Sequence, residues 1–296
     1  MSDETRKTLR LFFKNHMAVA GLVIVLLLVA TALVAQFTIN DDDWRSQQLP
    51  IALQPPSAEH ILGTDHLGRS VAIRLLYASK TSLMVGVMVV AIGMTMGTVL
   101  GLLAGYLGGW YDRIISRVTD VVLAFPFMLL AIAVVATAGP WVMEKLEAMH
   151  IPTFSSLPVI LALGFASFPA YTRLVRGCVL SIKEEQFVDA ARALGSGRWR
   201  IMVKHILPNL TGTLMVYGTL RVSTAILAES SLSFLGLGAL PPEPTWGNML
   251  SDGREYLLFY PWLPLFPGLA ILLTVMGFNF LGDGLRDILD PYHRGD

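Results

Sequence analysis

Six long apolar runs dominate the pattern of hydrophobic and polar positions along the 296-residue chain. A membrane-spanning helix needs about 20 mainly apolar residues, and each run approaches or exceeds this length. Five of the runs contain no Lys, Arg, Asp or Glu, whereas the fifth in order contains Arg221 and Glu229. The pattern predicts an all-α polytopic membrane protein whose six transmembrane helices occupy residues 17–37, 81–111 (with a core at roughly 82–107), 121–138, 156–172, 209–235 and 260–282.

The basic residues between the runs predict the orientation, because Lys and Arg are enriched in cytoplasmic loops. If the N-terminus is cytoplasmic, the inner segments carry 15 Lys and Arg and the outer segments carry 6. An even number of spans places both termini on one side of the membrane. We therefore expect both termini in the cytoplasm, with inner segments 1–16, 108–120, 173–208 and 283–296 and outer segments 38–80, 139–155 and 236–259.

Composition agrees with a membrane protein and excludes other classes. Hydrophobic residues make up 54% of the chain and charged residues 15%, against about 25% charged in soluble domains. This excludes a soluble enzyme, a disordered chain and a secreted disulfide scaffold, and Cys178 is the only cysteine. Lys and Arg number 22, as do Asp and Glu, so charge gives no indication of a nucleic-acid partner.

The first run resembles a secretory signal peptide, because four basic residues precede it. Its apolar stretch is longer than the roughly 7–15 residues of a signal peptide, and further spans follow it. We therefore interpret residues 17–37 as a retained membrane anchor.

Five glycines recur at intervals of four residues along the second span. Small residues at this spacing lie on one face of a helix and let another helix approach closely in lipid. The stripe therefore predicts a helix-packing face, although the pattern does not say whether the neighbour belongs to this chain. Its members are Gly93, Gly97, Gly101, Gly105 and Gly109.

Catalytic signatures are missing from the sequence. There is no phosphate-binding loop of the GxxxxGK[ST] type, no HExxH zinc motif and no GxSxG nucleophile elbow. His60 and His66 share an outer loop and could bind a metal, but a pair without further ligands is more typical of a polar loop. The sequence therefore indicates no catalytic residue, no metal site and no cofactor bound by this chain.

The longest inner loop, residues 183–208, has an amphipathic pattern. Acidic residues precede its first half and Gly195 follows it, which predicts a short helix with a glycine C-cap. A second short helix is expected over 198–207, ending before Pro208. An apolar stripe on the first helix could lie on the bilayer surface or enter a groove on a cytoplasmic partner. The stripe consists of Phe187, Ala190, Ala191 and Leu194.

The same loop resembles the EAA loop of ATP-binding cassette (ABC) importer permeases, E-A-A-x3-G-x9-I-x-L-P. Here Asp189 occupies the Glu position and His205 an aliphatic one. Four further stretches resemble signatures of the dipeptide, oligopeptide and nickel permeases, in the order of that family. They are LGTDHLGR at 62–69, SFLGLG at 233–238, PPEPTWG at 241–247 and GDGLRDILDP at 282–291.

The resemblance, which is to C-type subunits of this family, implies a type I ABC importer permease fold in the bacterial cytoplasmic (inner) membrane. It implies a homologous B-type permease, two cytoplasmic ATP-binding subunits and an external substrate-binding protein as partners. ATP and Mg²⁺ would be bound by the partner ATPases, so this chain would not be an enzyme. The implied ATPase-coupling residues are Phe187, Asp189, Ala190, Ala191, Leu194, Gly195, Ile206, Leu207 and Pro208.

The resemblance also divides the chain into functional segments. Residues 1–80 would hold the cytoplasmic N-terminus, the first helix and a long external loop. Residues 81–283 would form the permease core of five helices, and 284–296 a cytoplasmic tail. Cargo would be dipeptides, oligopeptides, glutathione, nickel or metal chelates, carried across the cell membrane by ATP-driven import.

Charged groups inside a span are costly and mark functional or paired sites. Arg221 and Glu229 could line a path for the charged ends of a peptide, or they could be structural groups. A self-sufficient secondary transporter or channel is the rival function, but it would need charged or broken helices in both halves of the chain. An intramembrane enzyme would need a nucleophile–base pair or metal ligands within the spans, and none is evident.

Overall fold

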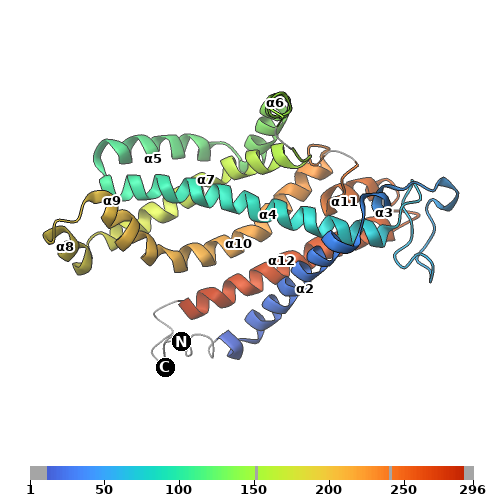
Figure 1. Ribbon diagram of the computed structural model, residues 1–296, viewed down its shortest axis with the longest axis horizontal. Coiled ribbons are helices and arrows are strands. Elements are labelled where there is room, and N and C mark those ends of the chain that lie inside the picture. The colour runs from blue at the N-terminus through green and yellow to red at the C-terminus, as the bar shows by residue number, and fades with distance from the viewer. Residues whose placement is uncertain (1–11, 151–152, 240–241, 290–296) are drawn as a thin grey trace.

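The computed structural model describes residues 12–150, 153–239 and 242–289. Their regular structure is helical, apart from an isolated β-bridge between Thr64 and Ser70. The long helices are α2 (His16–Thr38), α4 (Val71–Leu102), α6 (Phe127–Ala148), α7 (Leu157–Ile182), α10 (Leu207–Phe234) and α12 (Trp262–Leu289) (Figure 1). The shorter elements are α3 (Asp41–Arg45), η1 (Leu49–Ile51), η2 (Leu103–Leu107), α5 (Gly109–Ala124), α8 (Gln186–Ala193), α9 (Arg198–Ile201), η3 (Met202–Ile206) and α11 (Trp246–Arg254).

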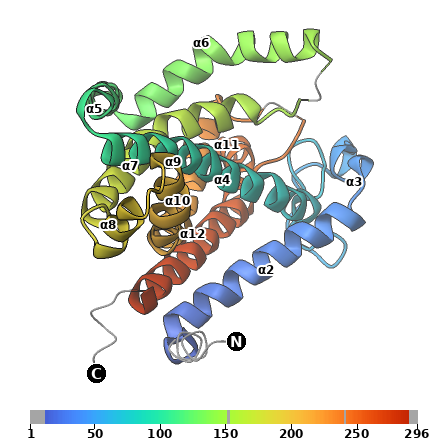
Figure 2. The same cartoon turned by 60° about the vertical axis from the view of Figure 1, so that its left-hand side comes forward.

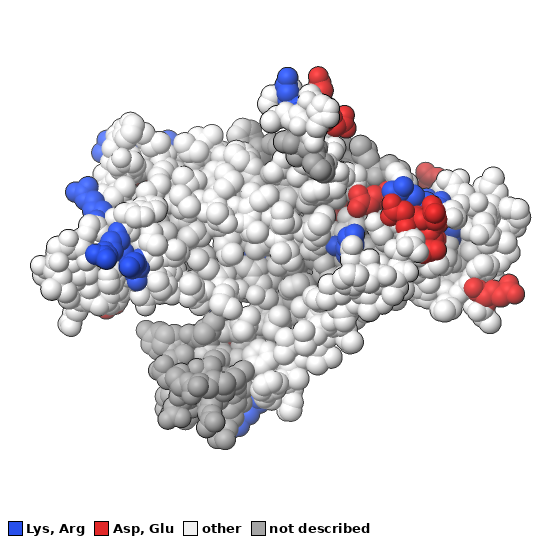
Figure 3. All heavy atoms as spheres, in the orientation of Figure 1, with Lys and Arg blue, Asp and Glu red and all other residues white. Residues whose placement is uncertain are grey.

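Six helices in the described part of the chain are long and apolar enough to cross a membrane, which confirms the predicted number. The start of α2, the end of α12 and helices α8 and α9 lie at one end of the molecule (Figure 1). Helices α3 and α11 lie at the opposite end. On the face shown in Figure 3, Lys and Arg lie over α8 and α9, and the largest group of acidic residues lies over α3. This arrangement agrees with an inner end that carries α8 and α9, and an outer end that carries α3 and α11.

Helices α4 and α7 pack closely along much of their length, and the glycine stripe is the reason. A Cβ atom added at any of four glycines would come too close to a side chain of α7 for a real contact, so only glycine permits this approach. The distances to the nearest such atom are 2.1 Å at Gly93, 2.3 Å at Gly97, 2.6 Å at Gly101 and 2.7 Å at Gly105. The predicted packing face is confirmed for these four, and its neighbour lies in this chain. Gly109 was wrongly included, because it begins α5 and nothing lies within 4 Å of its Cβ position.

Helix α2 packs along α12 on one side of the molecule, and α6 extends on the other side against α7 (Figure 2). A Cβ at Gly21 would lie 2.5 Å from the backbone nitrogen of Leu281, and one at Gly284 would lie 2.2 Å from the Cβ of Ala18. The first apolar run is therefore an integral helix of the fold.

The second span begins earlier than predicted, at Val71 instead of residue 81. Arg74 and Lys80 suggested a loop, but both lie on the helix: Arg74 is near Asp65 and Lys80 lies over the ring of Tyr77. With η2 the helix has 37 residues, or about 55 Å at ~1.5 Å per residue. This exceeds the roughly 30 Å hydrocarbon core, so its charged first turns can extend beyond the lipid.

Two other helix boundaries differ from the prediction, and both lie at prolines. The predicted span 121–138 is interrupted at Phe125 and Pro126, which separate α5 from α6. Pro208, by contrast, does not end a helix as predicted. α9, η3 and α10 form one continuous helical run from Arg198 to Phe234. The turn before Pro208 is π-helical, and such a turn accommodates the missing backbone donor of proline without ending the helix.

Candidate functional site

The loop between α7 and α10 is fixed to the inner end by its own apolar side chains. Val188 and Ala191 of α8 are buried in a cluster with Ile201 and Ile206 of the following helical run. Side chains from α4, α7 and α10 complete the cluster: Leu102, Val175, Val179, Leu210 and Leu214. Helix α8 is thus anchored at the inner end through a buried cluster that it shares with residues of α4, α7 and α10.

The other side of α8 is exposed. Phe187 and Ala190 are exposed, and Leu194 has 87% of its surface accessible. Trp199 on α9 extends this apolar surface and is also exposed. The predicted stripe therefore divides: Phe187, Ala190 and Leu194 face outward, whereas Ala191, only 6% exposed, faces the interior of the chain. The structure corrects the prediction that all four residues share one face of the helix, and adds Trp199, which sequence periodicity missed.

Gly195 ends α8 as predicted, in the left-handed conformation with φ of +76°. For a residue with a Cβ atom, this conformation costs roughly 1 kcal/mol of conformational free energy. The backbone N–H of Ser196 donates to the carbonyl of Ala191 at 3.0 Å, which closes the cap. Of the remaining predicted residues in this loop, Leu207 is half-buried and Pro208 is exposed.

Asp189 pairs within its own helix. Its Oδ1 accepts a hydrogen bond of 2.9 Å from Arg192 Nη1, and the Arg192 guanidinium lies 5.8 Å from the centre of the Tyr106 ring. The neighbouring Tyr106 side chain is the main cause that raises the pKa of Arg192 above its ordinary value. Asp189 therefore orients a cation on the exposed loop, a local role that the motif alone did not reveal.

Arg221 opens onto a cavity of about 300 Å³ that is lined by residues of α4, α5, α6, α7 and α10. Its guanidinium donates a hydrogen bond to the hydroxyl of Tyr217 and lies 4.7 Å from the centre of that ring. No carboxylate within the described ranges comes within 4 Å of it. The other residues that line the cavity are Val89, Val90, Leu123, Phe127, Ala166, Ser167, Ala170, Tyr171, Thr224 and Ala225.

Glu229 lies two turns further along α10 in a different environment. Its side chain is 1% exposed, and its Oε1 accepts a hydrogen bond of 2.7 Å from the hydroxyl of Ser233. The hydroxyl of Ser230 lies 3.5 Å from its other oxygen. Glu229 is not among the residues that line the cavity of Arg221, so the structure does not bring the two predicted path residues together.

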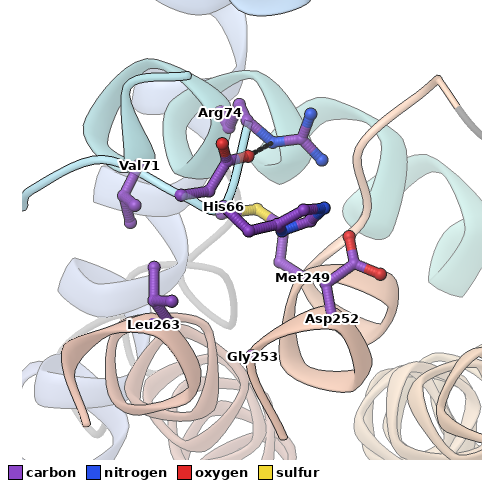
Figure 4. Close-up of a pocket in the computed structure, with 8 residues that line it drawn as sticks. His66, Val71, Arg74, Met249, Asp252, Gly253 and Leu263 are labelled. Atoms are coloured by element: carbon purple, nitrogen blue, oxygen red, sulfur yellow. Dashed lines mark ion pairs between the residues drawn. The ribbon is translucent and has the colours of Figure 1, made fainter. Parts of the chain in front are cut away.

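The outer end contains a polar cluster to which sequence reasoning assigned no role. Asp65 accepts hydrogen bonds from the backbone N–H of Arg69 at 2.9 Å and from its Nε at 2.7 Å. Arg74 Nε lies 3.7 Å from the same carboxylate. His66 and Asp252 converge on this point from the preceding loop and from α11 (Figure 4). The LGTDHLGR stretch was the available signal, and its Gly68, with φ of +72°, makes the turn that lets Asp65 reach back.

The PPEPTWG stretch, of which residues 242–247 are described, is hydrogen-bonded to α4 at the same end. Trp246 is buried; its backbone N–H donates to Ser82 Oγ at 3.0 Å and its Nε1 to the carbonyl of Leu75 at 3.2 Å. Glu243 accepts a hydrogen bond of 2.6 Å from the hydroxyl of Ser155. His66 stacks on Tyr256 with ring centres 5.6 Å apart. These contacts make the outer loops part of the packed structure.

Six helices long and apolar enough to span a membrane, with a short amphipathic helix at their inner ends, are the architecture expected of a transport permease subunit. The family model described as the binding-protein-dependent transport system inner membrane component matches residues 97–294. The model for the N-terminal transmembrane domain of oligopeptide transport permease C matches residues 5–56. The chain belongs to this family of ABC importer permeases and is a multi-pass protein of the inner membrane. Members of the family act with ATPases and a binding protein.

Several curated proteins are similar over almost the whole chain. The glutathione transport system permease protein GsiD of Pectobacterium atrosepticum is 44% identical over 286 residues, which cover 97% of this chain and 90% of that protein. The dipeptide transport system permease protein DppC of Alkalihalophilus pseudofirmus is 43% identical, with coverages of 97% and 89%. Among solved structures, a permease chain of the inward-facing MetNI methionine ABC transporter matches with a TM-score of 0.51 and 18% identity. It covers 71% of this chain and 95% of its own length, and it supports the type I fold.

Proposed function

We propose that this chain is the C-type permease subunit of an importer that carries small peptides, including glutathione. A homologous B-type permease, two cytoplasmic ATP-binding subunits and an external substrate-binding protein complete the transporter. The similar proteins GsiD and DppC are permeases for glutathione and dipeptide transport, which supports this cargo class. ATP and Mg²⁺ bind to the ATPase subunits, and this chain supplies no catalytic residue and no cofactor.

We infer that residues 183–208 couple ATP hydrolysis to movement of the spans. The observation that carries this proposal is the exposed apolar surface of α8, which is formed by Phe187, Ala190 and Leu194. Burying one such leucine or phenylalanine side chain in a partner's groove is worth about 1.5–3 kcal/mol. The buried cluster beneath α8, which includes Ala191 and Ile206, transmits force from the groove to α7 and α10. Asp189 orients Arg192, and Gly195, Leu207 and Pro208 shape the turn into α10.

The cavity at Arg221 supports a place for this residue on the translocation path. Glu229 stands apart, because its buried hydrogen bonds with Ser233 favour a structural role at the outer end of α10.

Substitution of Leu194 by Asp tests the coupling proposal. A carboxylate cannot enter an apolar groove without a large desolvation cost, so we expect the purified transporter to lose its ATPase subunits or its cargo-stimulated ATP hydrolysis. Because Leu194 contacts little of its own chain, the permease should still accumulate in the membrane.

Leu235→Asp is the matched control, because Leu235 is a leucine with 59% of its surface exposed at the outer end. It should retain the ATPase subunits. Normal uptake and ATPase retention in the Leu194→Asp transporter would refute the coupling role of this surface.

A further inference from the structure

We propose that the cavity at Arg221 binds the carboxylate group of the transported solute. The inference rests on the proposed import function and specifies the chemistry by which the path recognises its cargo. The ligand is a small organic acid with a free carboxylate, such as the C-terminal end of a short peptide.

The first argument is charge. A guanidinium carries five N–H donors, and a cation inside a membrane span is costly unless it is paired or hydrated. Within the residues that the structure covers, Arg221 has an aromatic ring and a hydroxyl at Tyr217 and lacks an acidic partner. A carboxylate would complete this environment, because it matches the guanidinium fork with two parallel, charge-assisted hydrogen bonds.

The second argument is the composition of the wall. Among the described residues that line the cavity, Arg221 alone has a charged side chain, so this lining carries a net positive charge. The remaining lining is mainly aliphatic and aromatic, which lowers the local dielectric and strengthens attraction of an anion. A cationic group would meet repulsion without a compensating carboxylate. The wall therefore selects anions over cations of the same size.

The third argument is size. A volume of about 300 Å³ lies at the lower end of the range of small-molecule pockets, about 300–1,000 Å³. This matches a solute of one or two amino-acid residues, or the end of a longer peptide. The apolar lining can accommodate varied side chains, while the guanidinium recognises the group that all such solutes share.

The tyrosine pair beside the cavity holds the guanidinium in place. Tyr171 is 1% exposed and packs edge-to-face on Tyr217 with ring centres 5.1 Å apart. Tyr217 in turn contacts the guanidinium of Arg221. In the portion of the chain described here, the Tyr171 hydroxyl has no hydrogen-bond partner. Tyr171 is thus a positioning residue whose ring fixes the geometry of the site.

The test measures the charge selectivity of the cavity directly in the assembled transporter. Cys178 is replaced by Ala, and Thr224, which lines the cavity, is replaced by Cys. A sulfonate-bearing and a trimethylammonium-bearing thiol reagent of similar size are then compared for their labelling rates. We expect the anionic reagent to be preferred, and Arg221→Gln to reduce that preference by about tenfold, equivalent to ~1.4 kcal/mol of charge interaction.

Ser57→Cys, on the exposed outer loop, is the matched control, because its reagent preference should not respond to Arg221→Gln. A ratio of anionic to cationic labelling at position 224 no higher than that at Ser57→Cys, an unchanged ratio in Arg221→Gln, or a cysteine that neither reagent reaches would each overturn the proposal.

Protection from labelling tests the ligand class. Glycylglycine should slow modification of Thr224→Cys, whereas glycylglycinamide, which lacks the carboxylate, should not. Failure of glycylglycine to protect at ~10 mM, ten times a Kd of about 1 mM, or equal protection by the amide, would exclude a carboxylate site. ATP-driven uptake by the unmodified transporter is measured separately. Absent uptake with retained anion selectivity would contradict the import proposal and leave the anion site standing.

Discussion

The outer and inner ends of the molecule differ in which side chains they bury and which they expose. At the outer end, charged groups are buried and paired within the chain: Asp65 is held by Arg69 and lies near Arg74. At the inner end, apolar groups are left exposed on α8, with Leu194 the clearest example. The outer end therefore has a structure that its own contacts determine, whereas the inner end leaves an apolar surface exposed, which we propose the ATPase covers.

The two ends should respond differently to substitution. At the outer end, loss of one partner leaves a buried charge and destabilises the subunit itself. At the inner end, an exposed position can be changed without loss of folding, and the damage falls on assembly. Three experiments test this contrast, in order of decreasing expected effect.

The largest effect is expected from Arg69→Ala. This change leaves Asp65 buried without its closest cation, and breaking a buried ion pair costs about 3–5 kcal/mol. We expect the subunit to disappear from the membrane, as measured by immunoblotting and by the unfolding temperature of any purified protein. Arg45→Ala is the control, because the Arg45–Asp41 pair is half-exposed at 3.2 Å and is worth about 0–1 kcal/mol. Equal stability of the Arg69→Ala and Arg45→Ala variants would show that the buried ion pair at the outer end is no more important for folding than an exposed one.

An intermediate effect is expected from a pair of neighbouring alanines on α8. Ala191 is buried and Ala190 is exposed. Ala191→Trp overpacks the cluster that fixes α8, at a cost of about 1–3 kcal/mol, and should lower the unfolding temperature of the permease. Ala190→Trp should leave that temperature unchanged and should instead release the ATPase subunits during purification.

The two readouts separate folding from docking. A stable Ala191→Trp subunit would show that this residue does not face the interior. A fully coupled Ala190→Trp transporter would show that the ATPase does not cover the exposed side of α8.

The smallest expected effect is on the pH dependence of stability, through Asp252 at the outer end and Asp112 at the inner end. Burial raises the pKa of Asp252 near the outer cluster, with the charge of Arg74 opposing the shift. The hydrogen bond from Arg176, with Nε 2.5 Å from Oδ1, lowers the pKa of Asp112 at the inner end. The sign of the linkage is therefore opposite at the two residues. Asp252 contributes stability that is lost as pH rises through its raised pKa, and Asp112 contributes stability that is lost as pH falls through its lowered pKa.

Thermal unfolding of the solubilised complex between about pH 3 and 7, a range that spans ordinary aspartate titration, measures both contributions. Asp252→Asn should stabilise the protein most at neutral pH, and Asp112→Asn should destabilise it most at neutral pH. Parallel pH profiles for wild type and both variants would show that neither carboxyl group is coupled to folding.

The sequence was sufficient for features that depend on the contrast between lipid and water. A separate apolar run of about twenty residues is stable as a helix across the lipid bilayer, so the number of spans could be counted directly from the sequence. The bias of basic residues predicted the orientation, and the glycine stripe predicted a close helix pair. The position of Gly195 predicted the cap of α8, because few residues other than glycine adopt φ of +76° without strain.

Tertiary structure decided what periodicity cannot show. In lipid, every face of a helix can be apolar, so the pattern does not reveal which face meets protein and which meets a cavity. Arg221 and Glu229 were indistinguishable as charged residues of one apolar run, yet packing places one at an open cavity and seals the other against Ser233. Ala190 and Ala191 have the same side chain, and only the helices packed beneath α8 make one exposed and the other buried. Hydropathy and backbone preference are local and can be read from sequence, whereas exposure depends on which segments meet in space.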